Sequence, residues 1–73
     1  MKAQTLMVAI QCVASEIKSL DAKLESGQIE DEAETEQVLL NWDLALVDLK
    51  EAYEIALEKY SIMPTYEQLL KSI

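Results

Sequence analysis

The chain has 73 residues, with one cysteine, no histidine, no arginine, and 14 acidic residues against 6 lysines, giving a net charge of −8. This length allows a single domain, residues 1–73, and the lone cysteine excludes an internal disulfide. Without histidine the chain lacks the usual general base near neutral pH, and without arginine it lacks a side chain that binds phosphate through two hydrogen bonds. The net negative charge disfavours direct binding to nucleic acid or to anionic membranes.

Apolar residues spaced by three and four predict a first helix over residues about 3–25. Its stripe is Ala3, Leu6, Ile10, Val13, Ile17, Leu20 and Leu24. This spacing keeps one helix face apolar, so that face needs a partner helix. Gly27 supplies the left-handed residue that commonly ends a helix, which predicts a turn over 26–30.

A second stripe with the same spacing predicts a helix over residues about 31–60. Its members are Leu39, Trp42, Leu46, Leu49, Tyr53, Ala56 and Tyr60. Asp31 and Glu34 have the spacing of a capped helix start, where the helix dipole favours negative charge. Pro64 then breaks the helix, and Thr65 with Gln68 forms a capping box for a short helix over about 65–73.

These elements predict an all-α protein, an antiparallel two-helix hairpin followed by a short C-terminal helix. No apolar run is long enough to span a membrane. Residues 5–14 could imitate a short signal peptide, but Gln11 interrupts the run and no cleavage pattern follows. A free cysteine suits a reducing compartment, so we expect a cytoplasmic protein.

The hairpin leaves apolar residues that one pair of helices cannot cover. Leu40, Leu44 and Val47 lie about 100° or more from the seam of the second helix. We therefore expect two hairpins to dimerise into a four-helix bundle. The alternatives are a complex with a different protein through the same surface, or a three-helix monomer in which the last helix folds back with Ile62, Met63, Leu69 and Ile73. The expected dimer or partner interface is Leu40, Leu44, Val47, Met7, Val8, Leu20 and Leu24.

Residues that could support chemistry have simpler interpretations. Nothing near Cys12 would lower its pKa, so we expect no nucleophile there. The acidic run lacks the spacing of a calcium loop, so we expect no metal and no cofactor. Further partner contacts are assigned to Tyr60, Tyr66, Glu32 and Glu36, although packing of the last helix and capping of the second helix are the simpler interpretations of these residues.

The sequence therefore predicts a non-enzymatic protein–protein interaction module that acts as a homodimer. An adaptor, a small chaperone-like subunit and an inhibitor all fit, with an unidentified and possibly basic protein as partner. The alternative is an acidic inhibitor, possibly phage-encoded, that imitates nucleic acid towards a basic DNA- or RNA-binding protein.

Overall fold

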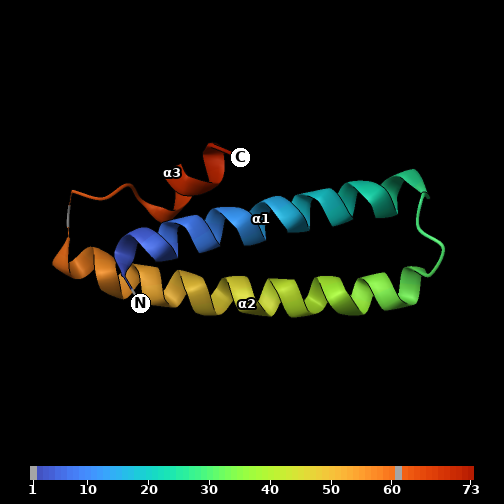
Figure 1. The fold of residues 1–73 in the computed structure, drawn as a ribbon, viewed down its shortest axis with the longest axis horizontal. Coiled ribbons are helices and arrows are strands. Elements are labelled where there is room, and N and C mark those ends of the chain that lie inside the picture. Colours follow the sequence, from blue (N-terminus) through green and yellow to red (C-terminus); the bar gives the residue numbers. More distant parts are fainter. Residues whose placement is uncertain (1, 61) are drawn as a thin grey trace.

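The computed structural model describes residues 2–60 and 62–73 and contains three helices, α1 (Ala3–Ser26), α2 (Glu32–Lys59) and α3 (Tyr66–Lys71). No strand occurs within those residues. Figure 1 shows α1 and α2 as an antiparallel hairpin, with α3 folded back beside the N-terminal half of α1. The all-helical class, the hairpin and the short last helix are confirmed, and the structure shows a single chain.

The local signals at the helix ends are satisfied by hydrogen bonds. Gly27 has φ 71°, and its N–H donates to the Leu24 carbonyl at 3.3 Å. Asp31 caps α2, since its Oδ1 accepts the Glu34 N–H at 3.0 Å. At α3, the Gln68 N–H donates to Thr65 Oγ1 at 3.2 Å, and the Thr65 N–H donates back to Gln68 Oε1 at 2.8 Å. The predicted capping box is therefore present.

The buried core lies towards the open end of the hairpin, where all three helices meet. Its buried members are Leu6 and Ile10 of α1, Tyr53 of α2 and Leu69 of α3. Met63 packs against this cluster, whereas Ile62 is 97% exposed. The C-terminal segment thus covers its own chain through Leu69 of α3 and through Met63, which precedes α3. The expectation that Ile62 would join this cover is wrong because its side chain points to solvent.

Two hydrogen bonds hold the C-terminal residues on α1. Gln11 Nε2 donates to Ser72 Oγ at 2.8 Å, and Lys18 Nζ donates to the Ile73 carbonyl at 3.5 Å. Together with Leu69 they place α3 against one side of the hairpin, so the opposite side and the outer face of α2 stay uncovered. Within residues 2–60 and 62–73, no helix has both the length and the apolar character needed to cross a membrane.

Candidate partner-binding surface

The largest group of exposed apolar side chains follows the outer face of α2. Leu40 is 50% exposed, Leu44 57%, Val47 54% and Ile55 62%. At about 100° per residue these four positions share one side of α2, opposite the side whose Leu46, Leu49 and Tyr53 face the core. We call Leu40, Leu44, Val47 and Ile55 the outer stripe. Exposed apolar side chains gathered on one face are typical of a surface that another protein covers.

The other predicted interface residues divide between exposed and packed positions. Val8, on α1, is 56% exposed, and Leu20 and Leu24 are half-buried. Met7 packs against the core of its own chain. Sequence reasoning overlooked Ile55, although it lies eight residues after Val47 and therefore near the same helical face.

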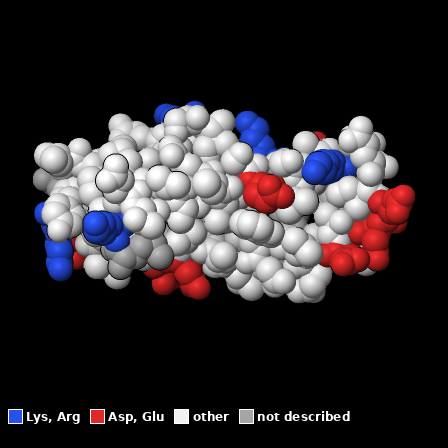
Figure 2. Space-filling view, in the orientation of Figure 1, with Lys and Arg blue, Asp and Glu red and all other residues white. Residues whose placement is uncertain are grey.

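Acidic side chains border the outer stripe along its length. By helical spacing, Glu36, Asp43 and Glu54 lie on one edge, Asp48 lies on the other, and Glu51 lies within the stripe. Figure 2 shows further acidic side chains gathered at the turn end of the hairpin, where the sequence places Glu30, Asp31, Glu32, Glu34 and Glu36. The predicted contact residues Glu32 and Glu36 are both exposed. A basic surface would meet complementary charge here.

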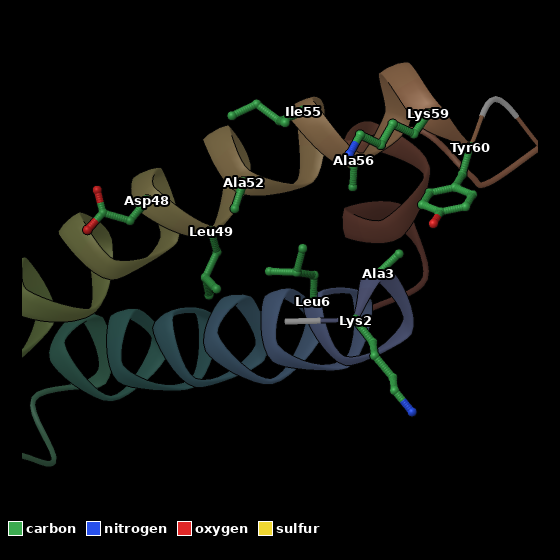
Figure 3. A pocket seen from close by; sticks show the side chains of 10 residues that line it. All are labelled: Lys2, Ala3, Leu6, Asp48, Leu49, Ala52, Ile55, Ala56, Lys59 and Tyr60. Carbon is green, nitrogen blue, oxygen red and sulfur yellow. The ribbon is translucent and has the colours of Figure 1, made fainter.

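A groove of about 520 Å³ opens between α1 and α2 at the other end of the stripe. Figure 3 shows Leu6 and Leu49 directed into the space between the two helices, with Ala52 and Ala56 above them. Ile55 belongs both to this groove and to the outer stripe. The remaining lining residues are Lys2, Ala3, Asp48, Lys59 and Tyr60. The small alanines leave room for an apolar side chain, and two lysines stand at the groove.

The two tyrosines predicted as partner contacts have different surroundings. Tyr60 is 55% exposed at the groove. Tyr66 is half-buried against the core, with Lys50 Nζ 5.3 Å from its ring centroid. Burial raises the pKa of the Tyr66 hydroxyl, and the nearby charge of Glu54 raises it further. Tyr60 is thus free to touch a partner, while Tyr66 mainly supports α3.

The described part of the chain offers little for catalysis. Cys12 is exposed and free. Residues 2–60 and 62–73 contain no group of three or more histidine, cysteine, aspartate or glutamate side chains placed to hold a metal ion.

Comparison with known proteins gives two matches across nearly the whole chain. The family model described as "T6SS, Immune protein Tsi2-like" matches residues 1–69. A relative from Pseudomonas aeruginosa, described as "Immune protein Tsi2", is 52% identical over 71 residues, which cover 97% of this chain and 92% of the relative. Both matches include the hairpin, the outer stripe and the groove.

Proposed function

Because the chain belongs to the family of T6SS immune proteins that resemble Tsi2, we propose that it is a non-enzymatic inhibitor that neutralises a T6SS toxin by binding it. The observation that carries this proposal is the outer stripe, an apolar surface that the chain's own helices leave uncovered. We place this binding in the cytoplasm of the cell that makes the protein, where the free Cys12 stays reduced.

Growth rescue and co-purification test the inhibitor proposal. Each candidate T6SS toxin of the source genome is expressed in a bacterial host with and without this chain. One toxin should arrest growth alone, lose that effect when the chain is present, and co-purify with it through two columns. The proposal is overturned if every toxin remains equally harmful and none co-purifies.

We further propose that the working form is a homodimer, two hairpins packed as a four-helix bundle. Among the described residues, the buried apolar core of the single chain consists of Leu6, Ile10, Tyr53 and Leu69, and small domains often gain stability by oligomerising. The contacts with the second copy or the toxin are assigned to Leu40, Leu44, Val47, Val8, Leu20, Leu24 and the exposed part of Met7, with Tyr60, Tyr66, Glu32 and Glu36 as secondary contacts with the toxin.

Sedimentation equilibrium at micromolar concentration tests the dimer. We expect twice the 8.2 kDa mass of one chain. A single species with the mass of one chain across the whole concentration range would exclude it, and would leave the toxin-binding proposal unaffected.

A second way of inhibiting uses the acidic turn end. Glu30, Asp31, Glu32, Glu34 and Glu36 crowd one tip of the molecule and could imitate nucleic acid phosphates towards a basic toxin (Figure 2). The test is competition: a toxin that binds an oligonucleotide should release it when this chain is added, more completely at low salt than at high salt. Simultaneous binding of both would exclude this mode.

A further inference from the structure

Resting on the proposed function, we propose that the outer stripe binds one amphipathic helix of the toxin. That helix is apolar along one side and carries lysine or arginine on both edges, and it lies parallel to α2 with its C-terminal end towards Lys2 and Lys59. The length of the stripe, its acidic edges and the difference in charge between its two ends support this assignment.

The length of the stripe suits a helix. Leu40 and Ile55 are fifteen residues apart on one α-helix, which corresponds to about 22 Å at 1.5 Å per residue. Leu44 and Val47 lie between them, three residues apart, so they form neighbouring ridges on the same face. An apolar helix face of about four turns covers such a surface, as in other helix-in-groove complexes.

The acidic edges select a basic occupant and disfavour a second copy. If two copies of the stripe met antiparallel with Leu44 opposite Val47, the two-fold axis would bring the same edge of each copy together, with Glu36 of one copy opposite Glu54 of the other. A parallel arrangement would bring the Asp43 edge of one copy against the Asp48 edge of the other. Like charges brought together at an interface weaken it, whereas lysine or arginine at the edges of a partner helix would pair with them.

The two ends of the stripe differ in charge, and this sets the direction of the bound helix. Glu32, Glu34 and Glu36 precede the stripe. At its other end, Lys2 at the start of α1 and Lys59 of α2 line the groove and offset the charge of Glu58. A helix has a partial positive charge at its N-terminus and a partial negative charge at its C-terminus. Its C-terminal end therefore meets the two lysines, and an apolar side chain from its last turn enters the groove between Leu6, Ala52 and Ala56 (Figure 3).

Point variants with a matched control test the assignment on the toxin identified by growth rescue. Leu44→Gln and Val47→Gln change side chains that are 57% and 54% exposed, and Ile62→Gln makes a similar change at a 97% exposed position between α2 and α3. We expect each α2 variant to lower toxin affinity by about tenfold or more, as for central interface contacts, and Ile62→Gln to change it less than about twofold. Circular dichroism and sedimentation of every variant report its fold and mass.

The outcomes separate this inference from the proposed function. If wild type binds the toxin and both α2 variants bind it equally well, the inference is overturned and the inhibitor role stands. It is overturned in favour of a second copy if these variants turn a dimer into a monomer while toxin affinity is unchanged. If no toxin binds the wild type, the proposed function fails, and the surface itself is still tested with a peptide.

The peptide test uses a synthetic helix of about fifteen residues, with leucine on one face and lysine elsewhere, and a counterpart with glutamate for lysine. The lysine peptide should shift the amide NMR signals of residues 40–55, and its affinity should fall about tenfold for the Leu44→Gln variant. Its affinity for the double variant Asp43→Asn/Asp48→Asn should change less with salt concentration than its affinity for wild type. A nitroxide on the C-terminus of the peptide should broaden the NMR signals near Lys59. A nitroxide on its N-terminus should broaden the signals near Glu36. Equal binding of both peptides, or broadening in the reverse order, overturns the proposal.

Discussion

The phenolic hydroxyl of Tyr53, on α2, donates a 2.6 Å hydrogen bond to the backbone carbonyl of Pro64, between α2 and α3. The Tyr53 ring is 0% exposed and packs with Leu6 and Ile10 of α1 and with Leu69 of α3. One side chain therefore joins the hairpin to the segment that closes it. This contact links the core at the open end of the hairpin to the position of α3.

Replacing Tyr53 with phenylalanine should destabilise the protein while keeping the ring in place. The Pro64 carbonyl loses its donor in a part-buried site, so we expect a loss of about 1–2 kcal/mol in the free energy of unfolding. Urea denaturation followed by circular dichroism, at one fixed protein concentration, measures it. Tyr60→Phe removes a hydroxyl from a 55% exposed residue and serves as the control. Equal midpoints for the two variants would show that the hydrogen bond contributes nothing.

The protein should lose stability at alkaline pH through its buried tyrosines. Burial raises the pKa of Tyr53 above the ordinary 10.0, and burial with the charge of Glu54 does the same for Tyr66. Above about pH 10 the unfolded chain therefore releases phenolic protons that the folded chain retains, and the free energy of unfolding falls as pH rises. Below that pH both states hold these protons and the contribution is fully present.

Urea denaturation from about pH 8 to about pH 11.5 checks this dependence. The double variant Tyr53→Phe/Tyr66→Phe should start less stable but lose less stability across that interval. Tyr60→Phe should keep the wild-type slope. If the free energy of unfolding of the double variant falls with pH as steeply as that of wild type, groups other than these two tyrosines cause the loss of stability at alkaline pH.

Two leucine-to-alanine changes should separate stability from recognition. Leu69 is 3% exposed and closes the core from α3, so Leu69→Ala should cost about 2–5 kcal/mol, as for other buried leucines. Leu40 is 50% exposed on the outer stripe, so Leu40→Ala should change stability by only about 0.5 kcal/mol or less. Thermal unfolding of both variants, together with toxin binding by Leu40→Ala, provides the measurement. The structure is wrong at α3 if Leu69→Ala is as stable as wild type.

The sequence was sufficient to predict the helices because each one carries its own local signals. Apolar spacing gave the extents of α1 and α2, and Gly27, Asp31 and Thr65 marked where elements end or begin. Such signals act over three or four residues, so they can be read without knowing the tertiary structure. The packing of Leu69 against Tyr53 depends on the path of the chain around Pro64, which local signals do not determine.

The candidate surface was predictable only in part for the same reason. Leu40, Leu44 and Val47 stood out because they lie off the seam of their own helix. Ile55 lies on that same face and could have been included in the stripe. That it also lines the groove could not be predicted, because the groove depends on where α1 begins relative to α2. Met7 looked equally free in the sequence, and only the position of α3 shows that it packs inside the chain.

The turn of the hairpin should be sensitive to backbone conformation alone. Gly27 has φ 71°, and no heavy atom lies within 4 Å of the place where a Cβ would stand. Gly27→Ala therefore meets no clash with neighbouring groups, and its cost comes from the left-handed conformation, about 1–2 kcal/mol. Gly27→Asn should cost less, because asparagine adopts this conformation more readily than alanine. Thermal unfolding measures both, with the exposed Gln28→Ala as the control, and a shift of about 4–8 °C is expected for each kcal/mol in a domain of this size. If alanine were tolerated as well as asparagine, residue 27 would not hold a left-handed conformation in solution, and α1 would end differently from the Gly27 cap described above.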